Sequence, residues 1–362
     1  LVEQKCAEMG GRIRRHRNKN FGDLLEVRFG RRGKGLRPIL LLGHLDTVWP
    51  VGTLAKMPFR ISEGRIWGPG VLDMKAGVAM GLAAVGILMR AKLLHRPVVM
   101  LLNSEEEVGS PVSRTVTERL AAECETVYVL EPAQTIPLPG PVGSRKVDAE
   151  KFHSFDGAYK TARKGVGDFV VRVTGVAAHS GVDFGAGRSA VNELARQIES
   201  IAAFTDLGRG MTVNVGVIGG GTRSNVIAGE AWAEVDVRIA KKLDAAKIDR
   251  LFRGLRVIDK GCRIQVTGGI NRPPMERTAA TIALFNRAAT FAAQMGFHLS
   301  EAATGGGSDG NFTSALGIPT LDGMGAVGEG AHAAHESLLI EHLAPRTALI
   351  AAMLTDADAE TS

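Results

Sequence analysis

Apolar runs alternate with helix-like segments along the first third of the chain. The mostly apolar runs 38–48, 98–102 and 126–131 predict buried strands, because such runs are typical of a parallel sheet covered on both faces. The segments 76–94 and 110–120 predict helices, the second opening with Ser110 as a cap and a proline in the first turn. This βαβαβ order indicates an α/β domain with a mostly parallel sheet and helices on both faces.

The pattern changes after the third run. Residues 132–164 are rich in proline, glycine and charge, and they predict a long connection. The region beyond has strand patterns at 169–175, 211–218 and 231–239 that alternate around two helices, one of them at 190–204. Helices at 278–295 and 337–354 then resume the first pattern. We therefore expect one domain from residues 1–165 and 274–362, with a smaller α+β domain, 166–273, inserted into it.

Composition fits a soluble globular protein, with 45% hydrophobic and 23% charged residues. No apolar stretch approaches the roughly 20 residues of a membrane helix, so no membrane partner is expected. Residues 1–10 have no signal-peptide architecture, which favours a cytoplasmic location. The chain starts with Leu rather than Met, which leaves a removed leader, and with it export, open.

Charge and cysteine content narrow the function classes further. The net charge is +6, and the basic runs 12–17 and 31–37 come with only two tyrosines and no nucleic-acid-binding motif. We therefore expect a solvated basic edge and no nucleic-acid partner, although positive charge would also suit an anionic substrate. Three widely spaced cysteines predict reduced core thiols rather than a disulfide framework.

Three consecutive glutamates, Glu105, Glu106 and Glu107, follow the apolar run 98–102. Adjacent carboxylates repel one another, and each is costly to remove from water without a compensating positive charge. The triplet therefore indicates either a solvated loop or a place where a cation binds.

Candidate metal ligands recur at the carboxyl ends of the predicted strands, which is where binding sites are usually found in parallel sheets. His44 and Asp46 share one face of an extended segment, because strand side chains alternate with period two. Asp73 lies in a glycine-rich turn before a helix, and Glu131 ends the third run. The remaining candidates are Glu107 in the triplet and His332 near the C-terminus, with His335 as its alternative. This mixed nitrogen and oxygen set suits zinc, cobalt or manganese, and it holds two ions if one carboxylate bridges them.

Eight motifs run along the chain in a fixed order: GHLDTV, GPGVLDMKAG, NSEEEVGS, VLEPA, TGVAAHSG, RSNVIAGEAWAEVDVR, GGGSDGNF and GAHAAHE. In these motifs the chain resembles the zinc exopeptidases and deacylases that include glutamate carboxypeptidase (carboxypeptidase G), acetylornithine deacetylase, succinyl-diaminopimelate desuccinylase and aminoacylase. The closest resemblance is to glutamate carboxypeptidase. It implies an α/β catalytic domain around two metal ions, with an inserted lid domain that usually forms a homodimer.

The resemblance also implies a role for individual residues. The implied metal ligands are His44, Asp73, Glu107, Glu131 and His332, with Asp73 bridging. Asp46 would orient His44, Glu106 would act as the general base, and Glu105 could stay solvated. His179 would polarise the scissile carbonyl at the partner's metal site. The substrate carboxylate would be held by Asn225, Arg238 and Arg272. His332 is preferred to His335 because the family places its histidine four residues before Glu336.

The expected activity is hydrolysis of an amide bond to a free C-terminal amino acid, glutamate by preference, with two divalent ions, zinc first. The first alternative is a deacylase of N-acetyl or N-succinyl amino acids. A remote alternative is an NAD-dependent oxidoreductase, because residues 185–190 fit G-x-G-x-x-A with Asp206 about 20 residues on. A third alternative is a metal-binding protein that has no catalytic activity. The presence of Glu106 argues against it.

Overall fold

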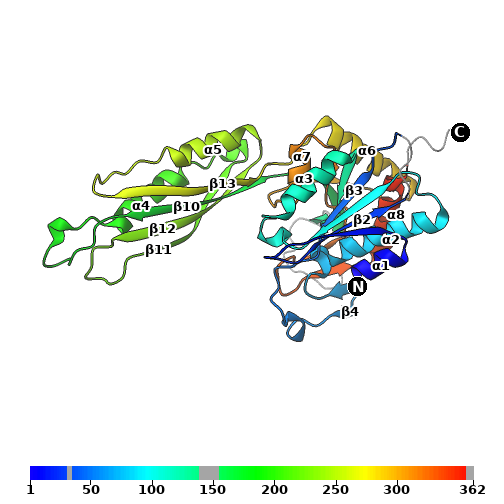
Figure 1. The fold of residues 1–362 in the computed structure, drawn as a ribbon, viewed down its shortest axis with the longest axis horizontal. Coiled ribbons are helices and arrows are strands. Elements are labelled where there is room, and N and C mark those ends of the chain that lie inside the picture. Colours follow the sequence, from blue (N-terminus) through cyan, green and yellow to red (C-terminus); the bar gives the residue numbers. More distant parts are fainter. Residues whose placement is uncertain (31–34, 138–154, 356–362) are drawn as a thin grey trace, which may run out of the picture. The chain divides into compact units, whose positions relative to one another are not determined.

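The computed structural model describes residues 1–30, 35–137 and 155–355, and these form two compact units (Figure 1). The first, called here the α/β unit, comprises Leu1–Ala162, Arg277–Thr304 and Ser308–Ser362. The second, the inserted unit, comprises Arg163–Glu276 with Gly305–Gly307. The sequence prediction places the two junctions at 165/166 and 273/274.

A six-stranded sheet forms the centre of the α/β unit. Its strands, in spatial order, are β1 (Arg12–His16), β2 (Leu24–Phe29), β6 (Val98–Asn103), β3 (Ile39–His44), β7 (Thr126–Val129) and β15 (Thr320–Leu321). β3 runs parallel to both β6 and β7, and β15 runs parallel to β7. β1 and β2 are antiparallel additions that the sequence analysis did not identify. The predicted mostly parallel sheet is therefore confirmed, with an antiparallel edge.

Helices cover both faces of this sheet, as predicted. The main helices of the unit are α1 (Val2–Glu8), α2 (Ala76–Ala91), α3 (Ser113–Glu123), α6 (Ala279–Gln294), α7 (Gly310–Ala315) and α8 (Leu343–Leu354). Alternate residues of β3 point to opposite faces: Leu41 packs in the core with α2, α6 and α8, whereas Leu40 and Leu42 pack in the core with α3. Because both faces are buried, the central strands are apolar throughout.

Two predicted elements differ from the structure. The segment 132–164 contains β8 (Gln134–Pro137) and β9 (Phe155–Arg163), which pair with each other, and β9 also pairs with β14 (Glu301–Thr304). Residues 138–154 of the predicted connection lie outside the described residues. The segment 337–354 is a short strand, β17 (Ser337–Leu339), followed by a 3₁₀ turn and α8, and not one helix. β17 joins β16 (Gly328–Glu329), β5 (Arg65–Trp67) and β4 (Arg60–Ser62) in a small sheet.

The inserted unit is an antiparallel sheet with two helices packed on one face. Its strand order is β11 (Thr212–Gly220), β12 (Glu230–Ile239), β10 (Gly165–Thr174) and β13 (Arg263–Arg272). Strand β10 alternates buried and more exposed positions, and its buried side chains pack against α4 (Ala190–Ala202) and α5 (Leu243–Arg253). Phe169 stacks on Phe252 of α5 with ring centroids 3.9 Å apart. The predicted α+β character is confirmed, whereas α5 and β13 were not identified in the sequence.

One helical run in the described residues, Val71–Ala91, is long and apolar enough to span a membrane, contrary to the expectation from sequence. It contains α2, and 61% of the relevant stretch is buried inside the α/β unit. Burial against protein explains its apolar composition, because a helix that is apolar all round is either the core helix of a domain or a membrane span, and this one is mostly buried. All three cysteines are free and buried, as predicted.

We predict that Glu26 on β2 stabilises the α/β unit in an acid-sensitive way. Its carboxylate is only 2% exposed and accepts from Arg28 Nε at 2.6 Å and His16 Nε2 at 2.8 Å. Burial acts to raise the pKa of Glu26, but the bonds from Arg28 and His16 outweigh it and hold the pKa below the ordinary 4.5. Glu26→Gln should lower the free energy of unfolding by about 1.5–3 kcal/mol at pH 7.

The difference should shrink with acidity. Because the folded-state pKa is depressed, the stabilisation is fully present above about pH 4.5 and is lost as the pH falls through the folded-state pKa. Urea unfolding at pH 7 and at progressively lower pH measures it, with the exposed Glu8→Gln as the matched control. A difference that stays constant down to pH 3 would contradict the assignment.

Candidate metal centre

His44 is the last residue of β3, and its ring is held from one side by residue 46. The residue is 2% exposed, and its Nδ1 lies 3.0 Å from the main-chain oxygen of Asp46 and 3.5 Å from Asp46 Oδ1. A carbonyl oxygen only accepts, so Nδ1 carries a proton, and a metal ion would bind the ring through Nε2. The Asp46 carboxylate accepts instead from the backbone N–H of Glu107, at 3.0 Å from Oδ2. Asp46 therefore orients His44 mainly through its backbone, and its side chain fixes Glu107.

Asp73 lies between two histidines. Its Oδ1 is 3.2 Å from His44 Nε2, and its Oδ2 is 3.4 Å from His332 Nε2. The tight turn before α2 that carries Asp73 requires Gly70, which has φ +68° and no room for a side chain beside Thr47 and Lys75. Each oxygen of one carboxylate thus faces a different imidazole, which is the arrangement that a bridging ligand needs.

Each of the two histidines also lies near a second carboxylate. Glu131 Oε1 lies 3.5 Å from His44 Nε2, and Glu107 Oε2 lies 3.3 Å from His332 Nε2. His335 is exposed, and the described contacts bring His332 rather than His335 to the cluster. The structure therefore brings together the five residues that the sequence analysis proposed as ligands.

Glu106 lies in the same cluster. It is 8% exposed, and ligand atoms of Glu106, His44 and Glu131 lie within 4.8 Å of one another. The ligand atoms of His44, Asp73 and Glu107 meet the same criterion. Both Glu106 and Glu107 are therefore placed where they could bind a metal ion, and their other contacts must distinguish the ligand from the base.

Two observations indicate that the cluster is suited to binding divalent cations. Its donors are imidazole nitrogens and carboxylate oxygens, the set that zinc, cobalt and manganese accept. Glu107 Oε1 and Asp46 Oδ1 are buried oxygens without a hydrogen-bond partner in the described residues. Buried carboxylate oxygens normally have a partner, so an unpartnered one beside four other ligating side chains indicates a missing positive charge.

The pKa values of the cluster show how strongly it attracts positive charge. Burial acts to lower the pKa of His44, but Asp46, Asp73 and Glu131 raise it well above its ordinary range. Asp73 raises the pKa of His332 to about 9, and burial together with the Asp73 carboxylate raises that of Glu107 to about 7. Protons therefore occupy positions that a cation would take, and metal binding would release them.

Glu105 is a residue whose role the sequence analysis misjudged. It was expected to stay solvated, yet it is fully buried. Its Oε1 accepts from the backbone N–H of Val112 at 2.7 Å and from that of Ser113, so Glu105 caps α3. The predicted Ser110 cap is wrong, because α3 begins at Ser113 and Ser110 Oγ donates to Asp309 Oδ1 at 2.5 Å. Nothing in the local sequence distinguishes the buried glutamate from its two neighbours.

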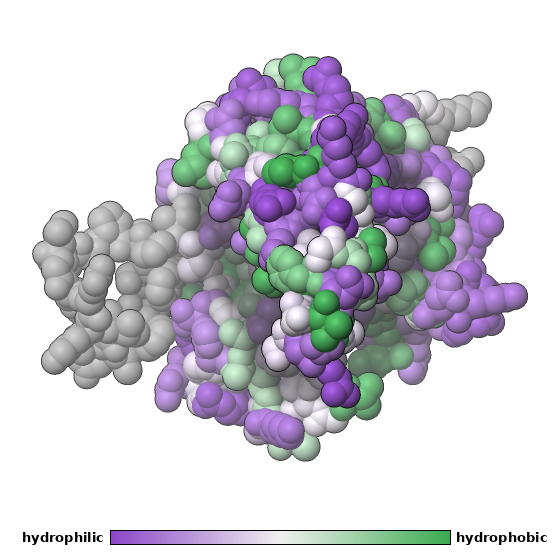
Figure 2. Space-filling view, turned by 90° about the vertical axis from the view of Figure 1, so that its left-hand side faces the viewer, coloured by the Kyte–Doolittle hydropathy of each residue, from purple (hydrophilic) through white to green (hydrophobic). Residues whose placement is uncertain are grey.

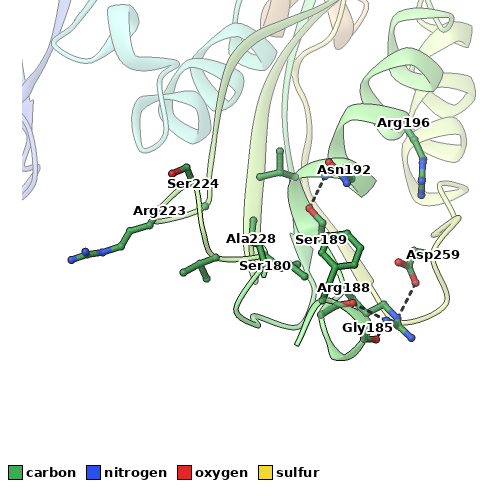
Figure 3. Close-up of a pocket in the computed structure, with 16 residues that line it drawn as sticks. Ser180, Gly185, Arg188, Ser189, Asn192, Arg196, Arg223, Ser224, Ala228 and Asp259 are labelled. Carbon is green, nitrogen blue, oxygen red and sulfur yellow. Dashed lines mark hydrogen bonds and ion pairs between the residues drawn. The ribbon is translucent and has the colours of Figure 1, made fainter. Parts of the chain in front are cut away.

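The other proposed site residues belong to the inserted unit. His179 Nδ1 accepts from the backbone N–H groups of Gly181 and Val182 at 3.1 and 3.2 Å, which leaves Nε2 to carry the proton and donate. Asn225 lies on the adjacent loop, and its carbonyl accepts from Ser180 N at 3.0 Å. These two loops border a groove of about 740 Å³ (Figure 3).

Arginines lie around this groove without converging on one point. In Figure 3, Arg223 points away from Arg188, which lies near Asp259 with Nε 3.7 Å from Oδ1. The surface at the loop end of the inserted unit mixes hydrophilic and hydrophobic residues, and Figure 2 shows no broad apolar area on it. The groove therefore gives no sign of a single tightly bound anion.

Arg238 and Arg272 lie in one row of the sheet, since Val166 on β10 pairs with Arg238 on β12 and with Arg272 on β13. Arg238 makes a two-pronged ion pair with Asp236, with Nη2 to Oδ2 at 2.7 Å. Arg272 is 7% exposed. A substrate carboxylate at Arg238 would have to share or displace Asp236.

The dinucleotide fingerprint at residues 185–190 lacks its structural context. β10 ends at Thr174, and α4 begins at Ala190 after a short 3₁₀ turn, Phe184–Ala186. A phosphate-binding glycine loop requires a strand that leads directly into the helix. The structure does not support this alternative.

Comparison with known proteins agrees with this geometry. Residues 40–356 match the sequence profile described as peptidase family M20/M25/M40. The chain is 27% identical over 329 residues to carboxypeptidase G2 of Pseudomonas sp. (strain RS-16), an alignment that covers 89% of this chain and 74% of that protein. It is 27% identical to succinyl-diaminopimelate desuccinylase of Cereibacter sphaeroides, covering 98% of this chain and 92% of that protein. With acetylornithine deacetylase of Myxococcus xanthus it shares 28% identity, over 63% of this chain and 56% of that protein.

Solved structures share the fold at low identity. Aminopeptidase PepT of Bacillus cereus superposes with a TM-score of 0.74 at 20% identity, covering 98% of this chain and 90% of that one. The metallo-carboxypeptidase Sso-CP2 of Sulfolobus solfataricus gives 0.71 at 17% identity, covering 98% and 92%. The YXEP protein of Bacillus subtilis, described as a dinuclear metal binding peptidase, gives 0.65 at 14%, covering 98% and 89%. The resemblance inferred from the motifs is therefore confirmed, and the chain belongs to peptidase family M20/M25/M40.

Proposed function

We propose that the chain is a metal-dependent carboxypeptidase that hydrolyses the amide bond to a free C-terminal amino acid, with glutamate preferred. The observation that carries the proposal is the position of Asp73, whose two oxygens lie 3.2 and 3.4 Å from His44 and His332. The similarity to carboxypeptidase G2 over 89% of the chain supports the choice of substrate class.

Two divalent ions, zinc first and cobalt or manganese as alternatives, would be held by five side chains. His44 and Glu131 would hold one ion and His332 and Glu107 the other, with Asp73 shared between them. When bound, such ions polarise the scissile carbonyl and lower the pKa of water toward about 7. A proton on Nδ1 of His44, which leaves Nε2 for the metal ion, is supported by the carbonyl oxygen of Asp46 at 3.0 Å from Nδ1.

Glu106 is proposed as the general base. It takes a proton from the attacking water as the water oxygen bonds to the carbonyl carbon, and it passes that proton to the leaving amine as the C–N bond breaks. Glu107 has its backbone fixed by Asp46 and its Oε2 3.3 Å from His332, which favours Glu107 as the ligand of the pair.

Residues of the inserted unit are proposed to bind the substrate. Asn225, Arg238 and Arg272 would hold the substrate carboxylate, since guanidinium groups bind carboxylates in a fixed fork geometry. His179 would donate from Nε2 to the oxygen that becomes negative during attack, a role supported by the two N–H groups that occupy Nδ1.

The inserted unit is also proposed to form a homodimer. β11 is an edge strand of its sheet, and Val217 and Ile218 on it are 49% and 62% exposed. An exposed apolar edge strand is a surface that pairs with another chain unless it is covered. In this arrangement His179 of one chain acts at the metal centre of the other.

A deacylase of N-acetyl or N-succinyl amino acids is the second candidate. The alignment with the desuccinylase covers 98% of this chain, at the same 27% identity as that with the carboxypeptidase. Both reactions break an amide between an acyl group and an amino acid nitrogen, so the same metal centre would serve either. The acyl group on the substrate distinguishes them.

The proposed function is tested with a panel of N-acyl amino acids and C-terminal glutamyl dipeptides, each with a free and an amidated α-carboxylate. We expect hydrolysis of the free acids, with about two metal ions per chain, and loss of activity after chelation with recovery on adding zinc. Amidation should lower kcat/KM by about 10²-fold or more, because a charged contact is lost. Hydrolysis by a chelated, metal-free protein would exclude the metal mechanism, and equal rates on amidated substrates would exclude carboxylate binding.

Neighbouring glutamates should respond differently to the same substitution. Glu106→Gln should keep both metal ions and lose about 10²–10⁴-fold in kcat, because it removes the proton carrier and keeps the shape. Glu107→Gln should lose metal affinity as well. Metal analysis with steady-state kinetics measures both effects, and the exposed Glu63→Gln is the control. Wild-type metal affinity in both variants would contradict the ligand assignment.

Two inactive variants should restore each other's activity. His179→Ala should cost about 10²–10³ in kcat, because one donor to the developing oxyanion is lost. Co-expression of Glu106→Gln with His179→Ala should recover activity, since some heterodimers combine intact Glu106 and intact His179 at one site. Each variant expressed alone is the control. If differently tagged chains co-purify as heterodimers without activity, His179 does not act across the dimer.

A further inference from the structure

Glu336 is a buried carboxylate outside the proposed ligand set, and it accepts four hydrogen bonds. Its side chain is fully buried. Oε2 accepts from the backbone N–H of Gly70 at 2.8 Å and from Trp49 Nε1 at 2.8 Å. Oε1 accepts from the backbone N–H groups of Leu72 at 3.0 Å and Asp73 at 3.1 Å. With both oxygens occupied by donors, Glu336 is not available as a metal ligand.

The four donors come from two segments that carry candidate ligands, and Glu336 itself ends a third. Trp49 follows His44 on the loop after β3, and the other three donors belong to the turn that carries Asp73. Glu336 comes four residues after His332, at the end of a turn in which Glu336 N donates to Ala333 O at 2.9 Å. One carboxylate therefore fastens together the segments that hold both histidines and the aspartate between them.

The backbone around Glu336 is itself fixed. Its carbonyl accepts from Gly68 N at 3.3 Å, and β17, which begins at Ser337, pairs with β5 in the register Ser337–Trp67. The His332 end of the segment has less support, because His332 is 51% exposed in its side chain and has φ +65°. The rigidly held Glu336 is therefore placed so that it can set the position of the less constrained His332 relative to Asp73.

The chemistry at this point requires an anionic acceptor. All four neighbours are N–H donors, and a charged acceptor makes stronger bonds to them than a neutral one. In Glu336→Gln, the amide has the same shape as the carboxylate but keeps only one acceptor oxygen. Its own N–H groups would point at two of the four donors. It would therefore loosen the turn that presents Asp73 without changing the volume of the core.

We propose that Glu336 is a positioning residue of the metal centre, which fixes the distance of Asp73 from His44 and His332 and thereby sets metal affinity. The inference rests on the proposed function only in taking these three residues as ligands. Groups that orient metal ligands typically contribute 10–100-fold to metal affinity or activity. Glu336 does not touch the substrate, so its loss acts through Asp73.

The test compares Glu336→Gln with Glu341→Gln in the full-length chain. Both remove one negative charge from the same region, but Glu341 is exposed. Zinc affinity is measured by competition with a chromogenic chelator, which needs no substrate. We expect zinc to bind Glu336→Gln 10–100-fold more weakly than wild type. At zinc concentrations that fill the site, kcat should stay reduced while KM changes little, whereas Glu341→Gln should match wild type in all three measurements.

Trp49→Phe is the milder variant. It removes one of the four N–H donors to Glu336, keeps the Glu336 carboxylate and leaves an aromatic ring at position 49. It should weaken zinc binding less than tenfold, with metal-free thermal unfolding close to wild type. Should Glu336→Gln fail to fold, Trp49→Phe decides the matter. Unchanged zinc affinity in Trp49→Phe, or in a folded Glu336→Gln, would overturn the positioning role. A lower unfolding temperature of the metal-free protein with wild-type zinc affinity would assign Glu336 a structural role only. Wild-type protein that binds no zinc would instead refute the proposed function.

Discussion

Concentrated negative charge at the carboxyl ends of the central strands is the constraint on which the rest of the α/β unit depends. Glu106, Glu107 and Glu131 follow β6 and β7, and Asp73 reaches the same edge from the turn before α2. Carboxylates so close together are stable only with compensating positive charge. Among the described residues His44 and His332 supply this positive charge, and the carboxylates around them raise the pKa of each histidine.

The loops around the cluster are held by a second group of carboxylates, which bind backbone N–H groups instead of cations. Asp46 holds Glu107, Glu105 caps α3, and Glu336 holds the Asp73 turn. Such loops lack the hydrogen-bond ladder of a helix or sheet, so buried acceptors must satisfy their donors. The precision of the centre therefore depends on residues that are not candidates for ligation.

The two units handle charge in different ways. In the α/β unit, acidic groups outnumber their partners at one place, and a buried oxygen of Glu107 has no hydrogen-bond partner among the described residues. In the inserted unit, opposite charges pair locally, as Arg238 does with Asp236. The first arrangement favours binding a cation, whereas in the second the Arg238 guanidinium is already paired with a carboxylate.

The sequence alone determined the α/β class and the insertion of a second domain, because apolar runs and their periodicity are local properties. It also gave the candidates His44, Asp73, Glu107, Glu131 and His332, from ligand-type residues at strand ends and in glycine-rich turns and from the order of the motifs. It did not reveal β2 and β13, which pair with strands distant in sequence, or β1, a short edge strand with mostly basic side chains that pairs with β2. It also did not reveal the division of residues 337–354 into a strand and a helix. It also misjudged Glu105 and Ser110, since which of several neighbouring polar residues is buried depends on contacts made by Asn18 and Asp309. Tertiary structure decided these points because burial and hydrogen-bond partners belong to segments that meet only in the folded chain.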